Sequence, residues 1–320
     1  MKTPLTVRSR TREDDPILLD IYLQTEDVFR FTLEAWRFHM DERARVEGKK
    51  PVVMVGEVGG EIVGDWYVDP HYSGTDGVFF AAVEIAEVHQ GRGYGSDLWR
   101  DAERYLRERG VTKAYNSIRE NLERSQRFAA DRGFERTGRA DRMSRLVLAD
   151  ANLEGYEAID AEMEHRGITI RTIAEIGTDD DAFLRDLYEA TSAMIADIPR
   201  SEENWDPDPY DVWRKNFLQW PGAIAEAYWV ALQEGHPVGM ANLQKNGESG
   251  LLNGLTGVIP AARHQGIARA LKFRTIQWAR VQGFEHIDTA NDSANAPMLS
   301  INIPLGYKAL PAREEWVKLF

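Results

Sequence analysis

The stretch that decides the fold is Gln90–Gly95, which reads QGRGYG and has the form Q-x-x-G-x-G. A related stretch, RHQGIA at Arg263–Ala268, has the form R-x-x-G-x-A and begins 173 residues later. An apolar strand pattern precedes each stretch, and apolar residues at helical spacing follow it. A glycine-rich turn between a strand and a helix presents unpaired N–H groups at the start of the helix, where an anion is favoured.

Other landmarks repeat with nearly the same offset. Gly133-Phe134 and Gly306-Tyr307 are also 173 residues apart, and Val63-Gly64 and Val238-Gly239 are 175 apart. A near-constant offset across several landmarks indicates two copies of one domain. We therefore predict a first domain over residues 1–150, a linker over 151–166 and a second domain over 167–320.

Composition excludes several classes of protein. The chain has 320 residues, 43% of them hydrophobic, no cysteine and a net charge of −13. The charge argues against a nucleic-acid binder, and no apolar run is long enough to span a bilayer. The polar start has no signal-peptide pattern, so we expect a cytoplasmic protein that binds neither nucleic acid nor membrane. The seven histidines have no ligand spacing, so we predict no metal site.

Two other glycine-rich signatures fit less well. The chain has no G-x-x-x-x-G-K-[ST], which excludes a Walker loop. The stretch at Gln90–Gly95 is not G-x-G-x-x-G and lies in the middle of its copy, so a dinucleotide-binding Rossmann site is the weaker interpretation.

Both halves resemble the GCN5-related N-acetyltransferases, the GNAT family. That family's motif [QR]-x-x-G-x-[GA] matches Gln90–Gly95 and Arg263–Ala268, and its downstream Asn and Gly-aromatic positions match Asn121 with Gly133-Phe134 and Asn295 with Gly306-Tyr307. The second half also looks like tandem acetyltransferases of the mycothiol synthase type. The resemblance implies an α/β fold: two tandem domains, each a mixed, mostly antiparallel sheet flanked by helices.

The resemblance further implies acetyl-CoA as the acyl donor, with its pyrophosphate on the two loops and its pantetheine beside the strand that feeds each loop. For Asn121 and Asn295, a plain helix N-cap is the alternative role. The donor-binding residues expected in the first half are Val83, Ile85, Gln90, Gly91, Arg92, Gly93, Tyr94, Gly95, Ser96 and Asn121. Those expected in the second half are Thr256, Val258, Arg263, His264, Gln265, Gly266, Ile267, Ala268, Arg269 and Asn295.

Acetyl transfer to an amine needs a base, because the attacking nitrogen must lose a proton. Glu84, on the strand that feeds the first loop, is the candidate, and a solvent-facing strand position is the alternative. Many family members place a tyrosine where this chain has Ala129 and Asn302, so neither half supplies that acid. In the second half no carboxylate lies between Leu251 and Pro260, so its base is unknown, and Asp197, Glu202 and Glu203 are candidates only by their place in the expected acceptor loop. The motifs of the second half are the more complete, which favours the second half as the active one. The presence of Glu84 favours the first half.

The predicted function is transfer of an acetyl group to a primary amine of a small molecule or peptide. Aromatic and acidic residues between Asp197 and Trp220, such as Trp205, Asp206 and Trp213, predict an acceptor pocket in the second half. Ordinary helix packing is the alternative role of these residues. Two other functions stay open: acylation of a cysteinyl sugar of the mycothiol-synthase kind, and non-catalytic binding of an acyl-CoA by a regulator or scaffold. We expect the two halves to pair within one chain, which is a monomer or a homodimer.

Overall fold

The computed structural model describes residues 3–45, 50–71, 73–202 and 207–320. The chain folds into two compact units, and neither is a single continuous segment. Unit 1 contains the chain up to Ala140, a short piece that begins at Glu202, and the last residues, Arg313–Phe320. Unit 2 contains Asp141–Ser201 and Pro207–Ala312.

The sheet of unit 1 has the strand order β1-β2-β3-β4-β5-β13-β6. Neighbours from β1 to β4 are antiparallel, and β4 and β5 are parallel. The strands are β1 (Thr6–Ser9), β2 (Val52–Val58), β3 (Glu61–Pro70), β4 (Val78–Ile85), β5 (Lys113–Arg119), β13 (Arg313–Leu319) and the start of β6 (Glu135–Val147). Since β3 and β4 alternate side chains between two faces, each face of this sheet needs its own cover.

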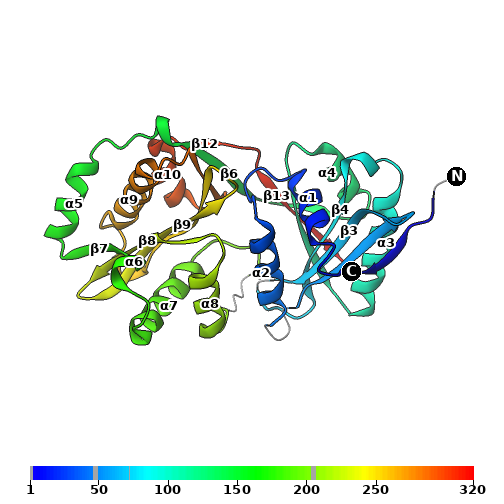
Figure 1. Cartoon of the computed structure of the whole chain (residues 1–320), viewed down its shortest axis with the longest axis horizontal. Coiled ribbons are helices and arrows are strands. Elements are labelled where there is room, and N and C mark those ends of the chain that lie inside the picture. The colour runs from blue at the N-terminus through cyan, green and yellow to red at the C-terminus, as the bar shows by residue number, and fades with distance from the viewer. Residues whose placement is uncertain (1–2, 46–49, 72, 203–206) are drawn as a thin grey trace. The chain divides into compact units, whose positions relative to one another are not determined.

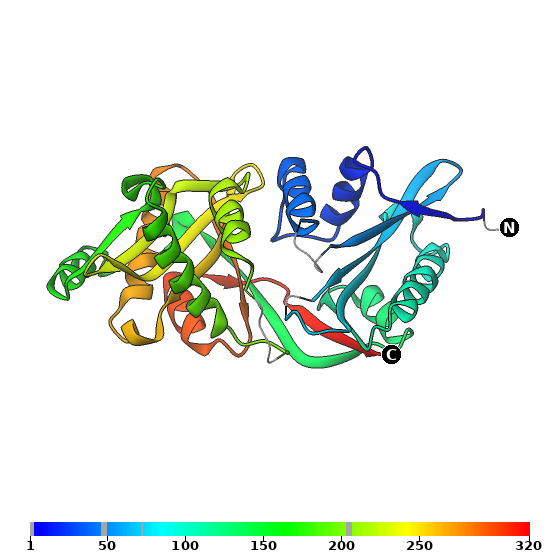
Figure 2. The same ribbon diagram turned by 90° about the horizontal axis from the view of Figure 1, so that it is seen from below.

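Helices cover both faces of that sheet, as Figure 2 shows. On one face α1 and α2 pack on Val53 and Val55 through Leu18 and Met40. On the other face α3 brings its apolar side onto Trp66 and Val68. The helices are α1 (Asp15–Leu23), α2 (Leu33–Arg43), α3 (Tyr94–Glu108) and α4 (Glu123–Ala130), and a short 3₁₀ turn, η1 (Glu87–His89), precedes α3.

Unit 2 repeats this plan with the strand order β6-β11-β10-β9-β8-β7, and β12 also pairs with β6. Its strands are β7 (Ile168–Thr172), β8 (Ala223–Gln233), β9 (His236–Asn246), β10 (Gly250–Val258), β11 (His286–Asp292) and β12 (Lys308–Ala309). Its helices are α5 (Tyr156–His165), α6 (Ile173–Ile176), α7 (Asp181–Ala196), α8 (Tyr210–Gln219), α9 (Ile267–Val281) and α10 (Ala296–Leu305), most of them labelled in Figure 1. The predicted fold class, two tandem mixed α/β domains, is confirmed.

The last strand of each sequence copy lies in the sheet of the other copy. Strand β13, at the chain's C-terminus, pairs along its whole length with β5 of unit 1. Residues Asp141–Val147 of β6, at the end of the first copy, pair with β11 of unit 2. The predicted linker 151–166 contains α5, which belongs to unit 2. The domain ranges predicted from the sequence describe the two copies of the repeat and stay a prediction. The compact units do not coincide with these ranges, because the two copies exchange their last strands.

Each sheet opens into a fork at the same place. In unit 1 the parallel pair β4–β5 is joined from Val78 to Phe80, after which the two strands continue without backbone pairing. In unit 2 the pair β10–β11 is joined from Gly250 to Asn253 and then separates in the same way. A fork between parallel strands exposes the backbone edge of the strand that feeds each glycine-rich loop, and an extended ligand chain can pair with such an edge.

The repeated Val-Gly pairs serve close packing beside the forks. A Cβ on Gly64 would lie 2.2 Å from the carbonyl oxygen of Glu84, so only glycine lets β3 approach β4 there. A Cβ on Gly239 would lie 2.9 Å from the Ile267 side chain at the start of α9. The landmarks that revealed the repeat are thus packing requirements of the fold.

Two observations bear on membranes and metals. Within the described ranges, no helix has both the length and the apolar character that a bilayer span requires. Across the same residues, no three His, Asp or Glu side chains gather as a metal ion would need.

Candidate active site

The two glycine-rich loops have the same backbone. Gly93 is the N-cap of α3 with φ 86°, and Gly266 is the N-cap of α9 with φ 80°. Two residues earlier, Gly91 has φ 78° and its counterpart His264 has φ 63°. These left-handed conformations turn the chain so that each helix begins directly after the loop. In both loops a long helix starts here, and the N-terminus of such a helix favours an anion.

The first residue of each motif holds its loop to the preceding strand. Nε2 of Gln90 donates to the carbonyl oxygen of Ile85 at 3.0 Å, and Nε of Arg263 donates to the carbonyl oxygen of Val258 at 3.2 Å. Since the two bonds join equivalent positions, the [QR] at the start of the motif positions the loop. Their predicted contact with the donor stays a prediction.

One cavity in unit 1, of about 540 Å³, runs from the loop to the α1–α2 face of the sheet. Among the predicted donor-binding residues, those that line it are Val83, Ile85, Gln90, Gly91, Gly93, Tyr94, Gly95 and Ser96. Glu84 lines it as well. Arg92 and Asn121 are exposed and are not among the lining residues, and α4 begins two residues after Asn121.

The loop end of this cavity carries positive charge. A Cβ on Gly91 would lie 3.2 Å from Nη2 of Arg124, so that guanidinium lies beside the loop. Nη2 of Arg132 donates to Oγ of Ser96 at 2.7 Å. Both arginines line the cavity and come from the segment of α4 and its C-terminal turn. Guanidinium groups next to a helix N-terminus favour a phosphate-bearing ligand.

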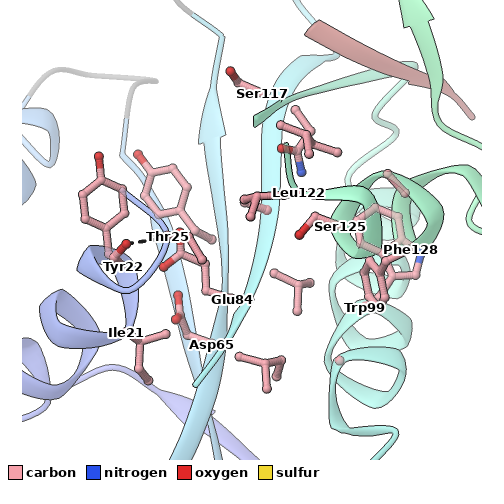
Figure 3. A pocket seen from close by; sticks show the side chains of 18 of the residues that line it. Ile21, Tyr22, Thr25, Asp65, Glu84, Trp99, Ser117, Leu122, Ser125 and Phe128 are labelled. Carbon is pink, nitrogen blue, oxygen red and sulfur yellow. Dashed lines mark hydrogen bonds between the residues drawn. The ribbon is translucent and has the colours of Figure 1, made fainter. Parts of the chain in front are cut away.

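The opposite side of the fork carries two carboxyl groups. Asp65 on β3 stands directly across from Glu84 on β4, so both side chains project from the same face of the sheet. Figure 3 shows both on the side of the strands where Tyr22 and Ile21 of α1 lie, with Trp99 and Phe128 on the other side. Asp65 is 6% exposed and Glu84 is half-buried. Glu84 therefore faces the cavity beneath α1, and the solvent-facing alternative does not describe it.

Burial keeps this pair from ionising normally. Desolvation raises the pKa of Glu84 well above that of an ordinary glutamic acid, and the charge of Asp65 raises it further. Desolvation also raises the pKa of Asp65. Because two adjacent carboxylates repel each other in a poorly solvated site, the pair holds a proton near neutral pH. A carboxyl group with a pKa near the working pH suits general-base catalysis.

These raised pKa values make a prediction about stability. A carboxyl group whose pKa is higher in the folded state stabilises the fold fully below its unfolded pKa, and that contribution is lost as the pH rises through the folded pKa. We expect Asp65→Asn to raise the melting temperature at pH 8 by about 3 °C or more, and the gain to vanish below about pH 4. Thermal unfolding from pH 4 to pH 9 checks this, with the exposed Asp76→Asn as the control. A gain that is equal at both ends of the range would contradict it.

The equivalent positions in unit 2 are apolar. The register pairs Gly257 with Met240, at the places that Glu84 and Asp65 occupy in unit 1. A Cβ on Gly257 would lie 2.9 Å from Cβ of Met194, so α7 fills the space that a longer side chain would need. Met194 and Met240 belong to one buried apolar cluster. The sequence has no carboxylate between Leu251 and Pro260, and in the structure a packed apolar core occupies the equivalent place.

The two forks also differ on the side where α3 and α9 pack. Trp99 lines the cavity of unit 1, and its equivalent in the repeat is Lys272, which is 1% exposed. Nζ of Lys272 donates to Oδ1 of Asn253, and burial lowers the pKa of Lys272 to about 7. The two forks therefore offer chemically different surroundings.

The loop of unit 2 lies beside acidic side chains of α5. A Cβ on Gly266 would lie 3.6 Å from Cε of Met163 and 3.9 Å from Oε1 of Glu162. Glu162 pairs with Arg166 at 2.9 Å. Asn295 is the N-cap of α10, and its Oδ1 accepts a hydrogen bond from the backbone N–H of Met298 at 3.3 Å. A donor site on the second loop stays a prediction, and the carboxylate at Gly266 weighs against it.

The other predicted residues lie as follows. Trp213 and Phe217 stack at 4.8 Å and pack on the core of unit 2, which is the helix-packing alternative. Asp197 pairs with Arg263 and Glu202 with Lys113, while Glu203, Trp205 and Asp206 fall outside the described residues. Ala129 is buried, and the buried Asn302 donates to Asn291. The sequence reasoning missed Asp65 and Tyr22. An acidic residue directly after the Gly64 landmark, inside an apolar strand, was the available signal for Asp65.

Comparison with known proteins decides the family. The model of the acetyltransferase (GNAT) family matches residues 17–134 and again residues 184–300. The chain belongs to the GNAT family of acetyltransferases. It is an acetyltransferase enzyme with two GNAT units in tandem, and family members generally use acetyl-CoA. The predicted family, fold and class of enzyme are confirmed.

Relatives of this GNAT enzyme include curated and solved proteins. It is 27% identical over 252 residues, 74% of this chain and 71% of the relative, to a mycothiol acetyltransferase of Acidothermus cellulolyticus. It is 24% identical over 264 residues, 79% and 80% of the two chains, to a mycothiol acetyltransferase of Amycolatopsis mediterranei. A tandem GNAT protein from the clavulanic acid biosynthesis pathway shares the fold with a TM-score of 0.73 at 16% identity, over 99% of this chain and 98% of that one.

Proposed function

We propose that unit 1 transfers an acetyl group from acetyl-CoA to a primary amine of a small molecule or peptide. The observation that carries the proposal is a single cavity lined both by the Gly91–Ser96 loop and by Glu84. Such a cavity gives the donor's phosphates and the acceptor's nitrogen access to one space, as a direct transfer requires.

The residues of this chain divide the work along the cavity. The first N–H groups of α3, with Arg124 and Arg132 beside them, bind the pyrophosphate. The open edge of β4 at Val83–Ile85 pairs with the pantetheine arm. Glu84 accepts a proton from the amine as the amine nitrogen bonds to the acyl carbon, and the bond from that carbon to sulfur breaks, so that CoA leaves as its thiolate. The proposed active unit is thus the one that contains Glu84, although the more complete motifs pointed to the other.

Matched glycine substitutions test the proposal. We expect Gly93→Val to weaken acetyl-CoA binding by about 100-fold, because a branched residue resists φ 86° and crowds the anion site. Gly266→Val brings the same strain into the other loop, at φ 80°, and is expected to leave acetyl transfer within about threefold. Calorimetry with acetyl-CoA and release of free CoA with an amine panel are the measurements, and thermal unfolding checks that each variant folds.

Two results would contradict the proposal in different ways. Native activity in Gly93→Val, with activity lost in Gly266→Val, would move the reaction to unit 2. Intact binding of acetyl-CoA without CoA release from any amine would indicate a non-catalytic acyl-CoA-binding regulator or scaffold.

The similarity to two mycothiol acetyltransferases favours a second candidate function, acylation of a cysteinyl sugar. The acceptor end of the cavity in unit 1 is lined by aromatic side chains and two acids, which suits an apolar amine better than a sugar with many hydroxyl groups. Incubation with acetyl-CoA and a cysteinyl amino sugar, followed by mass spectrometry of the product, separates the two candidates. Efficient acetylation of the sugar conjugate, with no turnover of simple amines, would establish the second.

A further inference from the structure

Asp65 is a buried acid that the fold does not require. It lies within β3 beside Trp66, which is 1% exposed, and one of its carboxylate oxygens, Oδ1, has no hydrogen-bond partner among the described residues. The same strand position in unit 2 is Met240, which packs in the apolar core. Because the same fold position holds a methionine in unit 2, the fold does not need a carboxyl group there. In unit 1 the buried carboxyl group lowers the stability of the folded state.

Asp65 raises the pKa of Glu84, but desolvation is the larger cause of that shift, so Asp65 is not needed for a base at this place. A general base needs one carboxylate, and Glu84 supplies it. Two arginines that line the cavity are already paired: Arg119 with Asp27, and Arg313 with Glu26. The pair Asp65–Glu84 therefore lies in a cavity whose neighbouring cations are neutralised, and a ligand that brings a positive charge would satisfy it.

The rest of the acceptor end is aromatic. Tyr22 of α1 lies 5.6 Å from Trp36 of α2 and 6.0 Å from Phe31, measured between ring centroids. Tyr67 and Phe80 meet edge to face at 6.2 Å on the sheet side of the same cavity. Rings of this kind bury an apolar body and also attract a cation through their faces.

From this arrangement we propose that Asp65 binds the ammonium group of the acceptor, and that the acceptor is an arylalkylamine without a carboxylate next to its nitrogen. This inference rests on the proposed function of unit 1 and specifies its substrate class. Asp65 holds the charged nitrogen beside Glu84, and Glu84 takes one proton so that the nitrogen's lone pair can attack the acyl carbon. The second proton that the nitrogen loses goes to the departing thiolate of CoA, and the aromatic rings enclose the body of the amine. A carboxylate beside the nitrogen would meet Asp65 and Glu84 at close range and be repelled.

The experiment compares amines with the amino acids that carry the same ring. The full chain is assayed with acetyl-CoA and 2-phenylethylamine or phenylalanine, and with tryptamine or tryptophan. We expect kcat/KM to be about 100-fold higher for each amine than for its amino acid. In Asp65→Asn we expect KM for 2-phenylethylamine to rise about 10-fold while the Kd of acetyl-CoA is unchanged. Asp65→Glu should recover part of that loss, and Asp76→Asn, an exposed carboxyl group of unit 1, should show none.

Calorimetry of 2-phenylethylamine with the CoA-loaded chain gives a readout besides turnover. Equal use of amines and amino acids, or an absence of both binding and turnover of 2-phenylethylamine, would overturn the inference. A change in Asp65→Asn that is confined to the pH profile of kcat, with KM constant, would assign Asp65 to tuning Glu84 and would also overturn it. If acetyl transfer still depends on Gly93 in these cases, the proposed function stands and only the substrate class is wrong.

Discussion

Replacing Glu84 with glutamine is expected to lower kcat for acetyl transfer by about 100- to 1,000-fold while leaving the Kd of acetyl-CoA within about twofold. Glutamine keeps the size and hydrogen-bonding groups of the side chain but cannot accept a proton from an amine. The proposed donor-binding groups lie at the loop, and Glu84 projects from the opposite face of the sheet. The chemical step should therefore suffer and donor binding should not.

The pH dependence of the native enzyme gives the same test in another form. The base must be deprotonated to act, and burial and Asp65 together raise the pKa of Glu84. Activity is therefore expected to fall as the pH drops through this raised pKa, well above the pH at which an ordinary glutamic acid is protonated. In Glu84→Gln the residual rate should lose this dependence. Measurement of kcat/KM from pH 5 to pH 9 with a saturating donor shows both profiles.

Glu87→Gln is the matched control. Glu87 is exposed in the 3₁₀ turn that follows β4, and it differs from Glu84 by only three positions. Its replacement should leave kcat and the pH profile as in the native enzyme. Native kcat in Glu84→Gln, with a normal melting temperature, would show that a different group or water takes the proton, and it would remove Glu84 from the mechanism.

The loops and the repeat were predictable because they depend on backbone geometry that few residues permit. Gly93 and Gly266 adopt left-handed conformations at helix N-caps, and Gly64 stands where any Cβ would strike a backbone oxygen. Such positions favour glycine regardless of the residues around them, so they can be recognised in the sequence. The same logic identified Gln90 and Arg263, although their observed hydrogen bonds hold the loop to the strand.

The acidic pair was not predictable, because it depends on how two strands align. Glu84 alone was visible as a charged residue between Val83 and Ile85, and alternation left its face undecided. Only the register of β3 on β4 brings Asp65 opposite Glu84, and only the packing of α1 and α2 makes that face a cavity. Alignment across strands is set by the hydrophobic pattern of whole elements, which single positions do not reveal.

The sheet to which the C-terminal strand belongs was not predictable for a similar reason. The repeat predicts a second domain over residues 167–320, which includes the segment that forms β13, and short-range reasoning places a strand with its neighbours in the chain. In the structure this strand fills the edge of β5 in unit 1, where Trp316 is 5% exposed within the core of that unit. The exchanged strands are equivalent in the repeat, so local preference alone does not choose between the two arrangements.

Removing residues 313–320 is therefore expected to inactivate unit 1, although the deleted strand is 217 or more residues from any part of the Gly91–Ser96 loop in the sequence. The deletion leaves β5 without its neighbour along seven registered positions and removes Trp316 from the core. It also removes Arg313, which lines the cavity and pairs with the buried Glu26. Loss of one buried tryptophan side chain alone costs about 3–5 kcal/mol, so the shortened unit should lose its cooperative unfolding transition.

Differential scanning calorimetry and acetyl transfer measure this effect, with the full chain as reference. A milder variant, Trp316→Ala, keeps the strand and should lower the stability of unit 1 by about 3 kcal/mol while the surviving folded protein still binds acetyl-CoA. In the chain that lacks residues 313–320, the edge of β5 is open. A peptide with the sequence of these residues should therefore add to that edge as a strand and restore part of the activity. Full activity in the chain that ends at Ala312 would mean that β13 is dispensable for the site, and the reaction would have to be explained without Arg313.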